Sequence, residues 1–253
     1  MKLGISGRSA LVTGASRGIG FAIAKGLAAE GVRVVLNARN QKALQEAVGK
    51  IRLEGGYAYG EAADISDLDQ IKSLFKRTQK LIGSPDIVIS NAGGPKVGTV
   101  ESLEEEDWLG AFNLTFMSTV RLTRMALPAM RKQGWGRIIN VTSISVKEPV
   151  PGLALSNAYR AAVTSYAKTL ANEIASEGIT VNGVGPGYTA TERLGEVVGE
   201  GRAMETLKAT VPLKRFASPD EVAAVCVFLA SQQAGYLTGQ TIFADGGFLS
   251  SVH

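Results

Sequence analysis

The stretch Leu11-Val-Thr-Gly14-Ala-Ser-Arg17-Gly18-Ile-Gly20 decides the fold of this 253-residue chain. A short apolar run over residues 9–12 leads into it, and the pattern of a helix follows over residues 21–30. A strand, a glycine-rich turn and a helix in this order are typical of a unit that binds dinucleotides. We therefore predict a dinucleotide site close to the amino terminus; a purely structural turn between strand and helix is the alternative.

Each glycine of this stretch has a physical role. Gly14 permits a tight turn at the strand end, and Gly18 and Gly20 remove side chains where the ligand and the strand approach the start of the helix. The free backbone N–H groups and the positive end of the helix dipole then face a diphosphate.

The composition indicates one globular α/β protein. With 45% apolar residues and 30 glycines, the chain can bury a substantial core and make many tight turns. No continuous apolar run reaches the roughly 18 residues that cross a membrane. Residues 1–7 lack the apolar segment of a signal peptide. We expect no membrane partner and a cytoplasmic location.

The scarcity of histidine and cysteine narrows the chemistry. The only histidine is His253, the last residue, which argues against a histidine-based acid/base mechanism and a histidine-ligated metal site. The only cysteine, Cys226, lies in an apolar helical stretch, so we expect a buried packing residue and no disulfide within the chain. We predict no metal site.

The charge pattern favours a solvated surface over a nucleic-acid interface. The formal net charge is +4 at pH 7, but the basic residues are scattered along helices beside acidic ones. No basic run and no patch of basic and aromatic residues stands out. We predict no nucleic-acid partner and some attraction for anionic ligands.

Short β-branched runs alternate with helical stretches along the chain, and no linker or repeat interrupts them. Continuous apolar runs suit the strands of a parallel sheet that is covered on both faces. We predict a single doubly wound Rossmann domain over residues 1–253, with a seven-stranded, mainly parallel sheet, helices on both faces and a small substrate lid at about residues 188–215. The expected strands are 9–12, 31–37, 57–62, 86–90, 136–142, 178–184 and 240–244, and the expected helices are 21–30, 41–54, 67–82 with Ser66 as N-cap, two segments within 103–132, 155–177 and 219–230.

The end of the second predicted strand indicates which nicotinamide coenzyme binds. An NAD site places a carboxylate there for the ribose 2′-hydroxyl, whereas an NADP site removes it and supplies arginine. Residues 36–40 hold no acid, Arg39 follows the strand, and Arg17 belongs to the glycine turn next to the same pocket. Two guanidiniums around a phosphate form charge-assisted hydrogen bonds of about 1.5–3 kcal/mol each. We predict NADP(H) rather than NAD(H); the alternative is that both arginines are ordinary surface residues.

Short motifs follow successive strands: Thr13-Gly-x-x-x-Gly18-x-Gly20, Asp64, Asn91-Ala-Gly93, Ser143 and Pro186-Gly187. Together with the tail, from Pro212-Leu-Lys-Arg through Leu237-Thr-Gly-Gln to Asp245-Gly-Gly247, they resemble the short-chain dehydrogenase/reductase family, and in particular its 3-oxoacyl-acyl-carrier-protein reductase branch. The resemblance covers essentially the whole chain. The cofactor-binding residues that it implies are Gly14, Ser16, Arg17, Gly18, Ile19, Gly20, Arg39, Asp64, Ile65, Asn91, Ala92, Gly93, Arg160, Pro186, Gly187, Thr189 and Thr191.

The resemblance also assigns these residues to parts of the coenzyme. Asp64 and Ile65 would lie at the adenine, Asn91 and Gly93 along the adenosine ribose, and residues 186–191 at the nicotinamide. All of them fall at the carboxyl ends of predicted strands, where an open α/β sheet places its ligand.

The same resemblance implies a catalytic set of asparagine, serine, tyrosine and lysine. The tyrosine exchanges the proton, the lysine lowers its pKa and holds the ribose, the serine binds the reacting oxygen, and the asparagine supports a water relay. Ser143 matches the serine, but the tyrosine position, 13 residues further on, is Ser156. The lysine position is Arg160 and the asparagine position is Thr115. Three of the four positions therefore depart from the family pattern, and the resemblance does not assure activity.

The replacements change the chemistry. A serine hydroxyl is far less acidic than a phenol, whose pKa is near 10, and it is too short to reach the place of the phenol oxygen. Arg160 keeps a positive charge on the helix face of Ser156, but its planar fork is not an ammonium point charge. Tyr159, about 60° around the helix from Ser156, offers a replacement acid; the alternative is that it packs against a neighbouring helix or subunit. The catalytic candidates are Ser143, Ser156, Tyr159 and Arg160.

Two classes of function fit these residues. The first is an NADP(H)-dependent oxidoreductase that moves a hydride between the nicotinamide and a small carbonyl or alcohol substrate of unknown identity, with Tyr159, Arg160 or ordered water managing the proton. The second is an NADP(H)-binding protein with lost or altered catalysis, a sensor or partner subunit; an isomerase or lyase on the same frame remains a further option. The resemblance also implies a homotetramer or homodimer. Candidate substrate-pocket residues on loops are Gly94, Pro95, Lys96, residues 146–150, Leu153, Tyr188 and Arg193.

Overall fold

The computed structural model describes residues 2–199 and 201–251. Its centre is one seven-stranded sheet in the order β3-β2-β1-β4-β5-β6-β7, and every neighbouring pair of strands is parallel. The predicted doubly wound fold is confirmed. The strands are β1 (Ser9–Val12), β2 (Arg33–Ala38), β3 (Ala58–Ala62), β4 (Ile87–Ser90), β5 (Gly136–Val141), β6 (Ile179–Pro186) and β7 (Thr241–Ala244).

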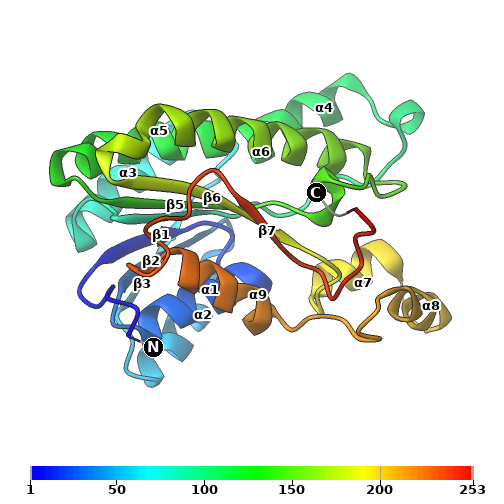
Figure 1. The fold of residues 1–253 in the computed structure, drawn as a ribbon, viewed down its shortest axis with the longest axis horizontal. Coiled ribbons are helices and arrows are strands. Elements are labelled where there is room, and N and C mark those ends of the chain that lie inside the picture. The colour runs from blue at the N-terminus through cyan, green and yellow to red at the C-terminus, as the bar shows by residue number, and fades with distance from the viewer. Residues whose placement is uncertain (1, 200, 252–253) are drawn as a thin grey trace.

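Helices cover both faces of the sheet (Figure 1). One layer packs around Ile23, Leu44 and Cys226, and the other around Leu74, Leu122 and Leu170. The first layer holds α1 (Gly18–Ala29), α2 (Gln41–Leu53) and α9 (Pro219–Leu229), and the second holds α3 (Leu68–Ile82), α5 (Ser118–Gln133) and α6 (Ala154–Ile174).

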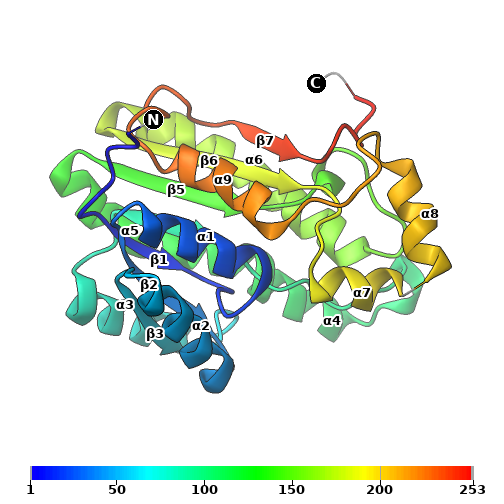
Figure 2. The ribbon, with the colours of Figure 1, turned by 90° about the horizontal axis from the view of Figure 1, so that it is seen from below.

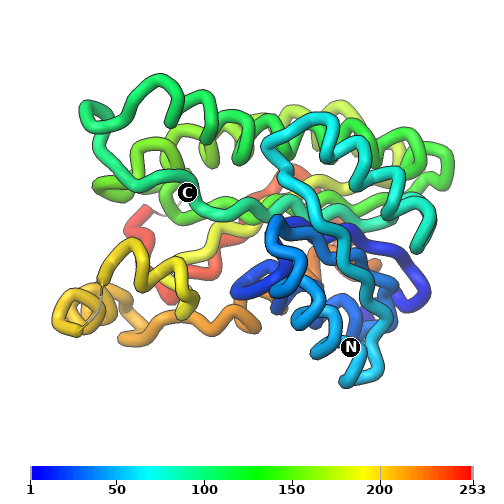
Figure 3. The backbone as a smooth tube through the Cα atoms, turned by 180° about the vertical axis from the view of Figure 1, so that it is seen from behind, coloured from blue at the N-terminus to red at the C-terminus, as the bar shows by residue number. Residues whose placement is uncertain are grey.

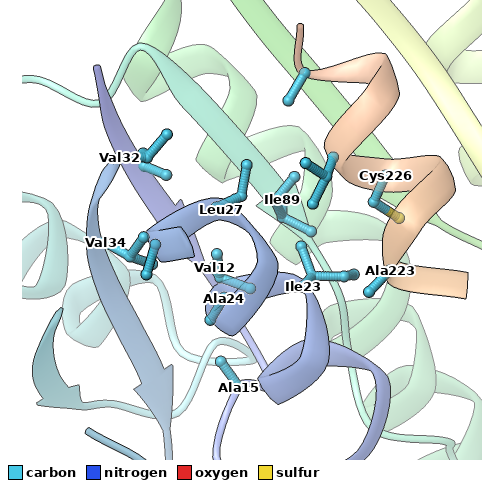
Figure 4. Close-up of a cluster of buried hydrophobic side chains, with 14 of the residues drawn as sticks. Val12, Ala15, Ile23, Ala24, Leu27, Val32, Val34, Ile89, Ala223 and Cys226 are labelled. Atoms are coloured by element: carbon cyan, nitrogen blue, oxygen red, sulfur yellow. The ribbon is translucent and has the colours of Figure 1, made fainter. Parts of the chain in front are cut away.

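The side chains of a single strand supply both cores. Val12 of β1 faces the first layer, where Ile23 and Leu27 of α1 pack against it (Figure 4), while Leu11 faces the second layer. Val12, Ile23 and Leu27 are fully buried. The burial of each of these side chains stabilises the fold by about 1.5–3 kcal/mol. Because both faces are covered, the strands are apolar at consecutive positions, as the sequence pattern indicated.

Cys226 lies in α9 and is fully buried against α1, as predicted for a packing residue (Figure 4). Burial raises the pKa of its thiol to about 12. His253, the only histidine of the sequence, lies outside the described residues. Within residues 2–199 and 201–251, none of the helices is long and apolar enough to cross a membrane.

Helix boundaries differ from the predicted ones where side chains cap the backbone. The cap of α3 is Asp67 and not Ser66, because the Asp67 carboxylate accepts hydrogen bonds from the N–H groups of Asp69 (2.8 Å) and Gln70 (3.0 Å). Ser66 instead donates its hydroxyl to the Asp64 carboxylate at 2.7 Å. A carboxylate acceptor makes the stronger bond to a helix N-terminus, so Asp67 takes the position.

The long helical region that precedes β5 contains an irregular turn. The short helix α4 (Glu105–Ala111) leads into a π-helical turn, Phe112–Met117, and then into α5. The helix α6 ends at Ile174, earlier than expected, and a 3₁₀ turn, Ala175–Glu177, completes the predicted stretch. Such π turns often mark functional sites, and Thr115 lies within this one.

Two short helices, α7 (Glu192–Val198) and α8 (Arg202–Thr210), follow β6. Figures 2 and 3 show them at one end of the molecule, beyond the carboxyl ends of the strands. They fall inside the region predicted as a lid, and its role as a lid remains a prediction.

Candidate coenzyme and catalytic site

The glycine turn lies at the carboxyl end of β1, at the point where the strand order reverses between β1 and β4. Gly14 and Gly18 both have a positive φ of 58°. A Cβ atom on Gly14 would lie 2.6 Å from the Asn91 carbonyl oxygen, and one on Gly20 would lie 2.2 Å from the Gly14 carbonyl oxygen. Neighbouring backbone atoms therefore leave no room for a side chain at either position, which explains why the motif has Gly14 and Gly20 there.

The amino terminus of α1 is open to a ligand. Its N-cap residue, Arg17, makes no side-chain cap hydrogen bond, and the first turn holds no acidic residue. The first N–H groups of a helix need a partner, and a diphosphate is a suitable one because the helix dipole favours negative charge there. The turn therefore fits the coenzyme that the sequence predicted.

Asn91 fastens the end of β4 to the glycine turn. Its amide nitrogen donates to the carbonyl oxygens of Thr13 (3.2 Å) and Gly14 (3.1 Å), and its backbone N–H donates to the Thr13 hydroxyl at 3.0 Å. Both amide hydrogens are thus used inside the protein. The predicted contact of Asn91 with the ribose would therefore be made by the side-chain oxygen of Asn91. Ala92 and Gly93 follow Asn91 at the same edge of the sheet.

A hollow of about 270 Å³ lies at the carboxyl ends of β2 and β3, where the adenosine end of the coenzyme is expected. Arg39 and Asp64 line it from the ends of β2 and β3. The Asp64 carboxylate is held by the Ser66 N–H and hydroxyl at 2.9 and 2.7 Å, and Ile65 beside it is buried. The lining residues are Arg39, Asp64, Ser66, Pro95, Lys96, Glu106, Asp107, Gly110, Ala111 and Leu114.

The two arginines predicted to surround one phosphate have different surroundings. Arg39 is exposed at the rim of the hollow and makes no ion pair with the described residues. Arg17 does not line the hollow; its guanidinium pairs with Glu192 and lies 3.8 Å from Glu196, both on α7. The binding of one phosphate by both Arg17 and Arg39 therefore remains a prediction, and in this structure the Arg17 guanidinium is paired with the carboxylates of α7.

The nicotinamide end of the predicted site is formed by the loop after β6. Gly187 donates its N–H to the Ala244 carbonyl at 2.9 Å, and the Thr189 hydroxyl donates to the Gly187 carbonyl at 3.1 Å. Thr191 is the N-cap residue of α7, and its Cγ2 lies 3.4 Å from the position of a Cβ on Gly18. The structure thus brings the loop after Pro186 next to the glycine turn, as the motifs indicated.

Ser143 lies two residues beyond Val141, the last residue of β5. Its backbone is extended, and its Oγ accepts a hydrogen bond from the Ser145 N–H at 3.1 Å, so its own hydrogen stays free to donate. The side chain is half-buried at the strand edge that carries the loop after β6. Ser143 can therefore hold an oxygen atom at this edge.

Arg160 is buried on α6 and is bound mainly by backbone. One terminal nitrogen donates to the carbonyl oxygens of Val141 (2.8 Å) and Thr142 (3.0 Å), and Nε donates to the Ser156 hydroxyl at 3.1 Å. The other terminal nitrogen lies 3.5 Å from the Ala92 carbonyl oxygen. The arginine thus joins the ends of β4 and β5 to α6, and it fixes Ser156, one turn away, as the shared helix face predicted.

Burial lowers the pKa of Arg160 to about 10, and the charge of Arg193 contributes to the same shift. None of the carboxylates in residues 2–199 and 201–251 forms an ion pair with Arg160. At neutral pH the guanidinium keeps its proton, so it acts as a fixed positive charge and as a donor.

Thr115 lies in the π turn and faces Arg160 across a cavity of about 10 Å³. Its hydroxyl is buried and has no hydrogen-bond partner among the described residues. The cavity has the volume that one water molecule needs, and its polar wall supplies partners for one. Thr115 therefore keeps a polar group at the position where the family has asparagine.

Tyr159 does not join this group. Its ring packs edge-on against Trp108, with centroids 6.1 Å apart, and lies 5.9 Å from the ring of Phe112. It also packs against the cluster formed by Leu103, Ala111 and Leu155. The structure therefore corresponds to the packing alternative, and it does not support Tyr159 as the replacement acid, because the phenol ring is directed to α4 instead of to Ser143.

Sequence reasoning did not identify Glu192 and Glu196 as part of the site, although their spacing of four places them on one face of a helix. It also did not foresee that Glu148 binds the tail, by accepting from the backbone N–H groups of Ser250 (2.8 Å) and Ser251 (3.3 Å). Tyr188, named as a pocket candidate, packs against the rings of Phe216 and Phe248.

Comparison with known proteins agrees with this geometry. A family model described as enoyl-(acyl carrier protein) reductase matches residues 14–249. The 3-oxoacyl-[acyl-carrier-protein] reductase of Synechocystis sp. is 38% identical over 247 residues, which cover 97% of this chain and 98% of that protein. The chain belongs to the short-chain dehydrogenase/reductase family.

Solved structures of this family give the same result. L-sorbose reductase from Gluconobacter frateurii, solved with NADPH and L-sorbose, has a TM-score of 0.94 at 34% identity, with both chains fully covered. YwfH, an NADPH-dependent reductase involved in bacilysin biosynthesis, has a TM-score of 0.93 at 32% identity over 97% of this chain and 99% of its own. Within the part of this short-chain dehydrogenase/reductase that the structure describes, no cluster of three or more His, Cys, Asp or Glu side chains is arranged to hold a metal ion.

Proposed function

We propose that this protein is an NADP(H)-dependent oxidoreductase that transfers a hydride between the nicotinamide and a carbonyl or alcohol carbon of a small molecule. The observation that carries the proposal is the open amino terminus of α1. It lies at the same sheet edge as Ser143 and Arg160, so that a dinucleotide and a substrate oxygen meet there. L-sorbose reductase, whose fold matches, was solved with NADPH bound, and YwfH, which also matches, is an NADPH-dependent reductase.

The choice of NADP(H) is supported by the end of β2. Arg39 is exposed at the rim of the hollow, and the strand end holds Asn37 in place of a carboxylate. The Asn37 amide is itself buried and donates to the carbonyl oxygens of Glu61 (3.0 Å) and Ala63 (3.1 Å). An arginine at a strand end that carries no carboxylate attracts the 2′-phosphate, and the 2′-hydroxyl of NAD lacks the acceptor that an acid at this strand end would supply.

When bound, the coenzyme supplies or takes up the hydride at the substrate carbon. Ser143 donates its hydroxyl hydrogen to the substrate oxygen and so orients the carbonyl. Arg160 adds a fixed positive charge behind that oxygen and holds the hydroxyl of Ser156. In the reductive direction the oxygen takes a proton from a water molecule at Ser156, since Tyr159 faces away and Arg160 keeps its proton.

NADPH oxidation with a panel of ketones, ketoacyl thioesters and quinones tests this proposal. We expect turnover on at least one class, and we expect Ser143→Ala to lower kcat by about 10²-fold because the oxygen loses its donor. Tyr159→Phe is the matched control on α6 and should keep the turnover of the parent protein. NADPH binding without turnover on the whole panel would contradict hydride transfer and favour a coenzyme-binding protein that has lost catalysis.

Association into a homodimer or homotetramer is a further part of the proposal. The aromatic residues Trp108, Phe112, Phe116 and Tyr166, on α4, the π-helical turn and α6, are each only partly buried. Leu109 beside Trp108 is 55% exposed. An apolar row of this kind favours contact with another copy of the chain. Sedimentation as a monomer at micromolar concentration would contradict this assignment.

A further inference from the structure

A continuous set of contacts bridges the coenzyme crevice through α7. On one side, Arg17 of the glycine turn pairs with Glu192 and lies 3.8 Å from Glu196. On the other side, Arg193 lies 3.2 Å from Glu196 and donates to the Pro95 carbonyl oxygen at 2.7 Å. We call these four charged residues, Arg17, Glu192, Arg193 and Glu196, the α7 clasp.

The two anchor points of the clasp lie on opposite walls of the site. Thr191, just before α7, lies within 3.4 Å of the position of a Cβ on Gly18, so the first turn of α7 adjoins the glycine turn. The Arg193 side chain packs on Gly94, where a Cβ would lie 2.6 Å from its Nε. The clasp therefore joins the loop after β1 to the loop after β4 across the crevice between them.

The charges of the clasp bear directly on the coenzyme. Arg17 is one of two arginines near the end of β2 that can bind a 2′-phosphate, yet its guanidinium already has two carboxylates on α7. The pair of Arg17 and Glu192 is well exposed, at 65% and 67% of the two side chains, so it is weak enough for a phosphate to replace. A phosphate and a carboxylate compete for the same planar fork.

We propose that Glu192 and Glu196 are specificity-determining residues that compete with the coenzyme 2′-phosphate for Arg17. This inference rests on the proposed use of NADP(H). NADPH must break the contacts of Arg17 with α7 in order to engage that arginine, whereas NADH has no 2′-phosphate and leaves the clasp closed. The two glutamates thus lower the affinity for NADPH and leave the affinity for NADH unchanged. They thereby reduce the preference for NADPH over NADH that Arg17 and Arg39 create.

The test measures both coenzymes on the full-length protein. The dissociation constants of NADPH and NADH are determined by fluorescence titration, at one fixed ionic strength, for the parent chain and for the double variant Glu192→Gln, Glu196→Gln. We expect NADPH to bind on the order of fivefold more tightly to the double variant, because exposed ion pairs of this kind contribute up to about that factor. NADH should bind with an unchanged constant.

Two controls separate competition for Arg17 from a general change in charge. Glu205→Gln on α8 also removes one acid from this region, where Glu205 pairs with Lys208 at 2.5 Å, and should leave both constants unchanged. In an Arg17→Ala background the two glutamine substitutions should have no effect on NADPH, because the group for which they compete is absent.

Equal tightening of NADPH and NADH, or tightening that persists without Arg17, would overturn the inference while leaving the proposed function in place. A parent chain that binds neither coenzyme would overturn the proposed function and this inference with it. A parent chain that prefers NADPH but does not respond to Glu192→Gln, Glu196→Gln overturns the inference alone.

Discussion

The coenzyme half and the catalytic half of the site are formed by different kinds of groups. The coenzyme half, between β1 and β4, is made of backbone groups, glycines and one asparagine that the fold itself needs. The catalytic half, around β5 and α6, depends on the identity of four side chains, Thr115, Ser143, Ser156 and Arg160. The coenzyme half keeps the family motif, while the spacing of the motifs predicts that three of the four catalytic positions differ from the family set. Close packing enforces the glycines of the first half, whereas the second half depends on which side chains occupy four positions.

The strongest test of this contrast restores the missing side chains. Ser156→Tyr combined with Arg160→Lys places a phenol and an ammonium group on α6, at the positions where the family resemblance implies them. A positioned general acid contributes about 10²–10⁴-fold to the rate, so we expect NADPH-dependent turnover to rise by a factor in this range. Steady-state kinetics on the best substrate of the panel measure the effect.

The matched control for that variant is Ser156→Phe combined with Arg160→Lys. It introduces the same ring without the hydroxyl, and it should not raise turnover. Equal rates for the two double variants would show that the hydroxyl is not what the catalytic half lacks, and the contrast between the halves would then have to be abandoned.

A second test disrupts the coenzyme half. Gly20→Ala places a Cβ at 2.2 Å from the Gly14 carbonyl oxygen, a backbone atom that cannot move without opening the turn. Overpacking against an immovable group costs about 3 kcal/mol. We therefore expect urea unfolding to reveal a loss of stability of about this size, together with weaker NADPH binding.

Gly49→Ala provides the comparison for Gly20→Ala. Gly49 also lies inside a helix, α2, but a Cβ there meets nothing within 4 Å. This substitution should stabilise the protein by up to about 1 kcal/mol, through helix propensity alone. Equal effects of the two substitutions would show that the turn is not enforced by packing.

The smallest effect is expected at the start of α9, which packs on α1 and so supports the coenzyme half from behind (Figure 4). Arg215 and the Ser218 N–H hold the pKa of Glu221 at about 2, below its ordinary value of 4.5. A lowered carboxyl pKa adds stability above the unfolded pKa, and this contribution is lost as the pH falls from about 4.5 to about 2.

Thermal unfolding at pH 7 and at pH 2.5 measures this contribution. The melting temperature of Glu221→Gln should lie slightly below that of the parent at pH 7, and the difference should shrink at pH 2.5. A gap that widens in acid would contradict the assigned role of the ion pair with Arg215.

The sequence predicts those features that are encoded locally. The glycine turn and the seven strands follow from short patterns in neighbouring residues, and the structure confirms them. The α3 cap is also local, but the choice between Ser66 and Asp67 depends on which oxygen reaches two N–H groups at once. Patterns of residue type do not contain that geometry.

The features that the sequence did not predict come from contacts between distant residues. Arg17 and Glu192 are 175 positions apart, and only the fold brings them together. Tyr159 faces Trp108 and Phe112 because of the way α4 crosses α6, which no periodicity within α6 reveals. Apart from Ser156, the partners of Arg160 are backbone carbonyls at the ends of β4 and β5, and backbone groups have no signature in the sequence.

The guanidinium of Arg160 has a consequence for how this protein can evolve. It holds the ends of β4 and β5 to α6 through several hydrogen bonds that a single ammonium group would make only in part. A change of this residue alone to lysine therefore loses structural contacts before any chemistry is regained. A change toward the tyrosine and lysine that the family resemblance implies therefore needs a second substitution that replaces the lost contacts before it can be tolerated.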